Sequence, residues 1–216
     1  MNNKLLYFDT ETTDIQTKDI IQLAILKDDG LTLNMFFKPI QDISFAAMAV
    51  HHLTPEFLST HQLFENAKLP EDFHDEGYYG DDLKGYLEYL ATEYTWVAHN
   101  IEFDAEVLRR KGISIAKQIC TFKLARNLLS EREMDLESYS LQYLRYSLGL
   151  YKKENGDHNI AHDALSDVYF LKDLFEYIKN NSSFTLEHMI QITKEPPIIR
   201  SINFGKHAGR SLLDIA

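Results

Sequence analysis

Short apolar runs dominate the first part of the chain, and longer helical patterns dominate the rest. Strand-length runs are expected at 5–8, 20–26, 31–37 and 95–98, with an edge strand at 113–119. The second and third runs flank Asp28-Asp29-Gly30, a sequence typical of a hairpin turn. These runs predict a sheet built early in the chain.

Apolar positions at helical spacing follow, and most of these segments begin with a capping residue or Pro55. The predicted helices are 45–50, 55–60, 83–94, one opened by His99-Asn100, 121–129, 140–148, 161–179 and 185–193. Residues 150–159 are expected to form a polar loop, and Pro196-Pro197 a break. Strands followed by helices indicate an α/β domain with a mixed sheet covered by helices.

Composition and charge narrow the class of protein. The 216 residues are 44% hydrophobic, and 33 acidic against 22 basic side chains give a net charge of −11. This balance argues against a protein that coats nucleic acid through bulk positive charge. The single cysteine, Cys120, excludes an intramolecular disulfide. The apolar runs are too short for a membrane span or a signal peptide, so a cytoplasmic location is expected.

The acidity is uneven along the chain. Six carboxylates and no Lys or Arg lie between Glu71 and Asp82. Such a run is typical of a solvated, partly mobile loop, and this is the interpretation that we expect the structure to support.

Four other carboxylates lie where the chain geometry draws attention to them. Asp9 and Glu11 end the first strand on the same side, Asp104 begins a helix after the 95–98 strand, and Asp167 lies in the long helix. Each alone is typical of a turn or a helix cap. Together in one cleft they would need cations, and hard oxygen ligands suit Mg²⁺ or Mn²⁺. Two such ions can promote phosphoryl transfer.

His162 is a candidate general base. Its offset of five residues from Asp167 corresponds to about 140° around a helix, so the two converge only if His162 lies in the loop that enters the helix. An imidazole accepts a proton from water near neutral pH. The alternative role is a cap at the helix start.

The residues around these candidates resemble the DEDDh class of DnaQ-like 3′→5′ exonucleases. Three ordered motifs carry the resemblance: 8–13 (FDTETT), 99–104 (HNIEFD) and 162–167 (HDALSD). Asp163 stands where a sister class has tyrosine, which favours the histidine class. Supporting segments are 50–54, 120–126 and 140–144. Asp14 departs from the family, which usually has glycine there.

The tail narrows the resemblance. Residues 204–210 (FGKHAGR) and 213–216 (LDIA) are similar to part of the small C-terminal module of the bacterial exodeoxyribonuclease X branch of this family. The resemblance implies a ribonuclease H-like mixed five-stranded sheet flanked by helices. It also implies an exonuclease domain over 1–182 and a C-terminal helix with a partial basic module over 183–216.

The resemblance also implies a site. Asp9, Glu11 and Asp167 would bind one of two Mg²⁺ or Mn²⁺ ions, Asp104 would serve the second, and His162 would deprotonate the attacking water. The residues expected to hold the DNA 3′ end are Thr10, Thr12, His51, Asn100 and Phe103. Without the resemblance, a position in the core explains Phe103 as well as a substrate-binding role does. A position in a surface loop explains His51 equally well.

DNA 3′ ends, single-stranded or frayed from a duplex, are the expected partner. Candidates for a basic track are 109–111, Lys123 with Arg126, 152–153, and Lys206 with Arg210, of which the tail pair is favoured. A free DNA-repair nuclease is the leading hypothesis. The alternatives are an epsilon-like proofreading subunit of a polymerase, an RNA-trimming exonuclease, and an inactive nucleic-acid-binding module.

Overall fold

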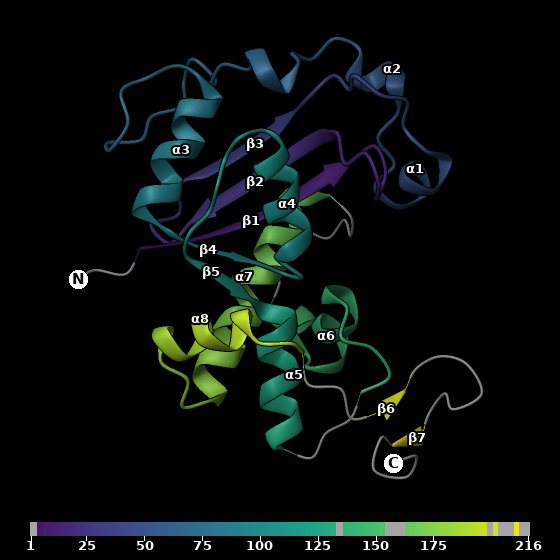
Figure 1. Ribbon diagram of the computed structural model, residues 1–216, viewed down its shortest axis with the longest axis vertical. Coiled ribbons are helices and arrows are strands. Elements are labelled where there is room, and N and C mark those ends of the chain that lie inside the picture. The colour runs from purple at the N-terminus through teal and green to yellow at the C-terminus, as the bar shows by residue number, and fades with distance from the viewer. Residues whose placement is uncertain (1–3, 133–135, 154–162, 198–200, 203–209, 212–216) are drawn as a thin grey trace.

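The computed structural model describes residues 4–132, 136–153, 163–197, 201–202 and 210–211. Its central feature is a five-stranded sheet of order β3-β2-β1-β4-β5 (Figure 1). The strands are β1 (Leu5–Thr12), β2 (Ile20–Lys27), β3 (Thr32–Phe36), β4 (Thr95–Ala98) and β5 (Gln118–Cys120). β1 pairs antiparallel with β2 and parallel with β4, so the sheet is mixed as predicted.

Turn chemistry explains the first half of the sheet. β2 and β3 pair antiparallel across the predicted hairpin, in which Gly30 has the left-handed φ of 95° that favours glycine. β2 is buried at every position, because helices cover both faces of the sheet. A separate two-stranded sheet pairs β6 (Ser201–Ile202) with β7 (Arg210–Ser211).

Helices cover the two faces of the sheet in two groups. The helices are α1 (Phe45–His51), α2 (Pro55–Leu58), α3 (Leu83–Glu93), α4 (Glu102–Arg110), α5 (Thr121–Glu131), α6 (Leu141–Ser147), α7 (Ala164–Asn181) and α8 (Leu186–Lys194), with 3-10 turns η1 (Phe64–Asn66) and η2 (Leu150–Lys153). Leu6 and Phe8 of β1 pack with side chains of α3 and α4, whereas Tyr7 packs with α5, α7 and α8. The alternation along β1 thus feeds two apolar cores.

Capping residues mark the helix starts much as the sequence predicts. The hydroxyls of Thr54, Ser140 and Thr185 accept hydrogen bonds from the first turns of α2, α6 and α8, and Pro55 opens α2. Asn100 differs from the prediction. It has a left-handed φ of 62° rather than the extended backbone of a cap, and α4 begins two residues later. Asparagine tolerates this conformation better than most residues.

The predicted edge strand at 113–119 is wrong in extent. Only Gln118–Cys120 pairs with β4, and it is indeed an outer strand of the sheet. Ile113 and Ile115 are instead buried in the core beneath α3 and α4, so their apolar character reflects burial and not strand pairing. Part of the predicted 150–159 loop is η2, and 154–159 lie outside the described residues, as do the first two residues of the predicted 161–179 helix.

The acidic run 71–82 is not simply a solvated loop. Asp75 has a side chain only 5% exposed, and it accepts hydrogen bonds from Lys27 Nζ at 2.9 Å and the Tyr86 hydroxyl at 2.7 Å. The burial of this carboxylate is possible because Lys27, itself buried in β2, neutralises it. Phe73 and Tyr78 pack against the same core. The run is therefore anchored to the sheet.

Among the helices of the described segments, none is long and apolar enough to cross a membrane.

The feature that matters most for function is the carboxyl end of β1. A bulge there shifts the register, since Glu11 pairs with Gln22 but Thr12 pairs with Ile20. Bulges of this kind bend a strand and aim side chains beside active sites.

Candidate active site

Three carboxylates meet at the end of β1. Asp9 and Glu11 alternate with Thr10, so they leave the strand on the side that faces α7, and Asp167 lies in the first turn of that helix. One oxygen from each of the three lies within 4.8 Å of the others. The predicted convergence of β1 with the long helix is therefore confirmed for these three residues.

Asp104 reaches the site from the other side of β1. Its Oδ1 accepts hydrogen bonds from the Thr10 amide at 3.1 Å and from the Thr10 hydroxyl at 2.7 Å. It is 4% exposed and does not belong to the group of oxygens within 4.8 Å that the described residues form. The structure thus separates a direct donor set of three carboxylates from a fourth that is hydrogen-bonded to the backbone between Asp9 and Glu11.

The electrostatics of the site favour cation binding. Burial, followed by the charges of Asp104 and Asp167, raises the pKa of Asp9 well above its usual range. Burial and the neighbouring Asp167 raise the pKa of Glu11 to about 8. Burial also raises the pKa of Asp104 to about 7, although the hydrogen bonds from Thr10 oppose this shift. Burial is the largest cause of all three shifts, and the charges of neighbouring carboxylates add to it for Asp9 and Glu11, so the donor set fits hard divalent cations.

Two glutamines that the sequence analysis did not single out hold this arrangement. Gln142 of α6 donates from Nε2 to Asp167 Oδ1 at 2.8 Å. Gln22 of β2 donates to Asp163 Oδ1 at 2.8 Å, and Asp163 caps α7 by accepting from the Ser166 amide. Gln22 is fully buried in an otherwise apolar stretch of strand, and this contrast was the available signal. Gln142 gave no comparable signal.

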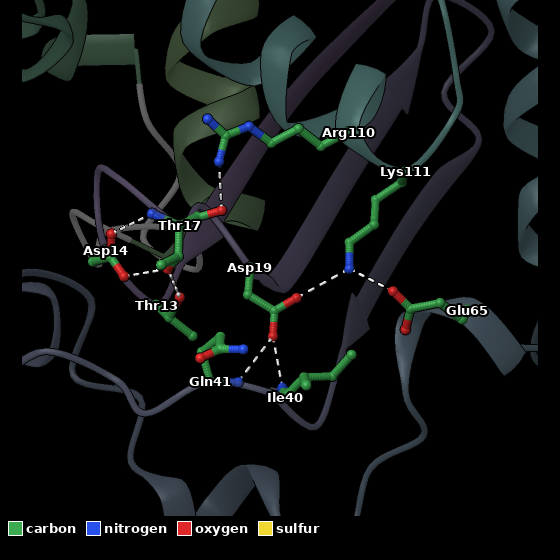
Figure 2. Close-up of polar contacts among 9 residues, drawn as sticks. All are labelled: Thr13, Asp14, Thr17, Asp19, Ile40, Gln41, Glu65, Arg110 and Lys111. Atoms are coloured by element: carbon green, nitrogen blue, oxygen red, sulfur yellow. Dashed lines mark hydrogen bonds and ion pairs between the residues drawn. The ribbon is translucent and has the colours of Figure 1, made fainter.

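The loop between β1 and β2 is held by its own side chains (Figure 2). The Asp14 carboxylate accepts from the Thr17 hydroxyl, the Thr17 amide and the Gln16 amide. These contacts, led by the Thr17 hydroxyl, lower the pKa of Asp14. Asp14 therefore replaces the expected glycine without a left-handed backbone, and Lys18 is the residue of this loop with positive φ, at 53°.

Cations from the end of α4 fix the same loop from outside (Figure 2). Arg110 donates to the carbonyls of Gln16 and Thr17 at 2.8 and 2.7 Å. Lys111 pairs with Asp19 at 3.0 Å and also with Glu65. Two members of the predicted 109–111 basic track are thus committed to intramolecular contacts. Since α4 also carries Asp104, these contacts tie the loop to the acidic site.

The residues expected to hold the DNA 3′ end differ in their exposure and in the groups that they contact. His51 ends α1 and is 6% exposed, so the surface-loop alternative is wrong; its Nδ1 accepts from the Leu53 amide at 2.9 Å. Thr12 is buried, and its hydroxyl donates to the Asp14 carbonyl. Phe103 is half-buried against the core, and Lys18 Nζ lies 4.4 Å from the centre of its ring. Asn100 is exposed beside α4.

Two further groups of predicted residues have different outcomes. His162 lies outside the described residues, as do the side chains of Lys206 and Arg210. Lys123 is buried and pairs with Glu102 at 2.7 Å, and Arg126 lies over the Tyr139 ring at 4.5 Å. These two cations of the predicted track therefore serve internal packing.

Comparisons with known proteins show which family and which relatives the chain is similar to. A family model described as an exonuclease, RNase_T, matches residues 6–175. Exodeoxyribonuclease 10 of Escherichia coli K12 is 30% identical over 220 residues, which cover 98% of this chain and 85% of that protein. A DNA polymerase III subunit epsilon-like protein of Rhodobacter capsulatus is 26% identical, covering 91% of this chain and 27% of that protein.

Solved structures of exonucleases have a fold similar to that of this chain. Exonuclease X in complex with 5′ overhanging duplex DNA has a TM-score of 0.61 and 28% identity, covering 88% of this chain and 99% of that chain. An exonuclease I structure has a TM-score of 0.65 at 16% identity, covering 88% of this chain and 43% of that chain, and it supports the fold alone. The predicted ribonuclease H-like fold and the resemblance to exodeoxyribonuclease X are confirmed. The match over residues 6–175 shows that the chain belongs to the RNase_T exonuclease family.

Proposed function

We propose that this protein is a metal-dependent 3′→5′ exodeoxyribonuclease that releases nucleoside 5′-monophosphates, acting in DNA repair in the cytoplasm. One observation carries the proposal: oxygens of Asp9, Glu11 and Asp167 lie within 4.8 Å of one another, with Asp104 hydrogen-bonded to the intervening Thr10. This arrangement concentrates negative charge at the end of β1 in an exonuclease fold. Without bound cations, this charge would repel a DNA phosphate.

Two Mg²⁺ or Mn²⁺ ions would relieve that repulsion. Asp9, Glu11 and Asp167 would hold the first ion, Asp9 would also contact the second, and Asp104 would serve the second through water. The raised pKa values of Asp9 and Glu11 fit this role, since burial and neighbouring carboxylates cause them and a bound cation would offset both effects. When bound, such ions activate water and stabilise the charge that develops in phosphoryl transfer.

The protein's own groups would then position the substrate and move the proton. His162 takes a proton from the attacking water, whose oxygen bonds to the terminal phosphorus. The bond from that phosphorus to the 3′-oxygen of the penultimate nucleotide breaks, and the 3′-oxygen gains a proton from solvent. The backbone at Thr10 and Thr12, together with His51, Asn100 and Phe103, holds the terminal nucleotide.

DNA is the proposed substrate because the matched relative is an exodeoxyribonuclease and the matched structure of exonuclease X contains duplex DNA. Single-stranded ends and frayed duplex ends are the proposed forms. The proposed exonuclease domain spans 1–182, and the proposed C-terminal segment 183–216 is a helix, α8, that packs on the core of that domain, followed by a partial basic module in which Lys206 and Arg210 contact the phosphate backbone.

A single-turnover assay tests the proposal. A 5′-labelled single-stranded oligonucleotide should shorten one nucleotide at a time, and a 3′-labelled one should release the labelled mononucleotide at once. EDTA and Asp9→Ala should abolish both signals. His162→Ala should slow the reaction by about 10²–10⁴-fold, the range for loss of a general base. Asp72→Asn is the control, because Asp72 is an exposed carboxylate of the 71–82 run and not a member of the acidic site.

Three outcomes would contradict the proposal. Internal fragments would show an endonuclease, and a rate with RNA far above that with DNA would favour the RNA-trimming alternative. DNA binding without cleavage at saturating Mg²⁺ or Mn²⁺ would indicate an inactive binding module. An unchanged rate in His162→Ala would remove this residue from the mechanism but leave the acidic site in place.

A further inference from the structure

A shallow depression, wide open to solvent, lies on the surface of α6 and is lined by Gln142, Tyr143, Tyr146 and Ser147. It adjoins the acidic site directly, because Gln142 donates to Asp167 at 2.8 Å. Tyr146 is four residues beyond Gln142, hence about 6 Å farther along the same helix face. The depression therefore extends away from the carboxylates along α6.

The helix that carries this surface is firmly placed. Arg145 is 5% exposed, donates to Gln142 Oε1 at 3.1 Å, and lies over the Phe170 ring of α7 at 3.8 Å. The same guanidinium lies 5.1 Å from the Tyr146 ring. The contacts of Arg145 thus fix Tyr146 relative to α7, the helix that supplies Asp167.

The surface itself is aromatic and open to solvent. Tyr146 is 57% exposed and Tyr151 is 43% exposed, and their ring centres are 5.5 Å apart at an interplanar angle of 43°. Lys152 Nζ lies 5.9 Å from the Tyr151 ring. Exposed aromatic rings with an adjacent cation are the chemistry that binds single-stranded nucleic acid, with bases on the rings and phosphates near the cation.

The face of the sheet on which α6 lies indicates which part of a DNA strand this surface would contact. Phe103 lies on α4 and packs with the core on one face of the sheet, whereas α6 packs with α7 on the other. The scissile phosphate must lie at the carboxylates between them. If the terminal nucleotide lies toward Phe103, the remainder of the strand leaves toward α6.

We infer that Tyr146 and Tyr151 form a stacking platform for DNA bases upstream of the two nucleotides that flank the scissile bond, with Lys152 near the strand's phosphates. This inference rests on the proposed exonuclease function and deepens it by assigning the path of the strand. Because stacking is tolerant of sequence, the platform would favour single-stranded ends of any sequence.

Steady-state kinetics on a dinucleotide and on a 12-nucleotide DNA test the platform. Tyr146→Ala should raise KM for the 12-mer by about 5- to 150-fold, the effect expected of one lost base–aromatic stack, with little change in kcat. The dinucleotide has no base upstream of the two that flank its single bond, so its kinetics should not change. Tyr146→Phe should restore the 12-mer KM, whereas Tyr146→Leu should not.

Tyr79→Ala is the matched control, because Tyr79 is 96% exposed and lies in the 71–82 segment rather than on α6. Equal KM values for Tyr146→Ala, Tyr79→Ala and the unmodified protein on the 12-mer would overturn the platform while leaving the nuclease function intact. Equal losses on the 12-mer and the dinucleotide would also overturn it, since they would indicate a structural role. An unmodified protein that cleaves neither substrate would refute the proposed function instead.

Discussion

Removing one charge from the acidic site should stabilise the metal-free protein. Oxygens of Asp9, Glu11 and Asp167 lie within 4.8 Å of one another, and two unit charges at that distance repel by about 3 kcal/mol at an effective dielectric constant of about 20. Proton uptake by the site relieves part of this repulsion. Asp9→Asn should therefore raise the free energy of unfolding at pH 8 in EDTA by about 1–3 kcal/mol.

The gain should depend on pH in a defined direction. Folding raises the pKa of Glu11 from 4.5 to about 8, so the folded state binds more protons than the unfolded state between these values. The free energy of unfolding of the unmodified protein should then fall as pH rises through this window. Folding also raises the pKa of Asp9 itself, and Asp9→Asn removes this carboxylate, so the advantage of the variant should be small at pH 5 and largest near pH 8.

Urea unfolding in EDTA from pH 5 to pH 9 measures this effect, with Asp72→Asn as a control that removes an exposed carboxylate of the acidic run. A second series measures unfolding in Mg²⁺. Adding Mg²⁺ should raise the free energy of unfolding of the unmodified protein more than that of Asp9→Asn, because a ligand that binds only the folded state adds to its stability. If Asp9→Asn were destabilising at pH 8 in EDTA, or matched Asp72→Asn, the carboxylates would not be mutually repelling in the folded state.

Three further changes test the supports of the site and the fold. Gln142→Leu removes the hydrogen bond to Asp167 and should lower activity or Mn²⁺ affinity by about 10- to 100-fold, measured by Mn²⁺ titration of the rate; an unchanged titration would deny it a positioning role. Asp163→Ala removes the cap of α7 and should cost about 1 kcal/mol in urea unfolding, so equal stability would contradict the capping contact. Asp75→Asn leaves the buried Lys27 ammonium with only the exposed Asp29 carboxylate as a counter-charge and should destabilise the protein by about 1–3 kcal/mol, whereas a change under about 0.5 kcal/mol would show that the Lys27–Asp75 pair is not buried in solution.

Much of the site follows from local patterns that the sequence displays directly. Alternation along β1 sends Asp9 and Glu11 to one side, and the helical pattern that follows His162 brings Asp167 into the first turn of a helix packed on the same strand. The hairpin at Gly30 and the caps of α2, α6 and α8 depend on residues only a few positions apart, so they too are predictable.

The remainder depends on partners far apart in sequence. Asp75 is buried because Lys27, 48 residues earlier, lies beneath it, and no local feature of the acidic run indicates that partner. Gln22 reaches Asp163 across 141 positions, and the link between Gln142 and Asp167 depends on how α6 packs on α7. The separation of Asp104 from the three-carboxylate group likewise follows from its hydrogen bonds to Thr10, which a motif does not reveal.

A crystal soaked in Mn²⁺ and a nucleoside 5′-monophosphate offers the most direct test of the central claim. Anomalous difference density should show manganese within coordination distance of Asp9, Glu11 and Asp167, with the nucleotide phosphate beside it. Manganese bound elsewhere on the surface, or no peak between these three carboxylates at saturating Mn²⁺, would contradict the assignment of this cluster as the catalytic metal site.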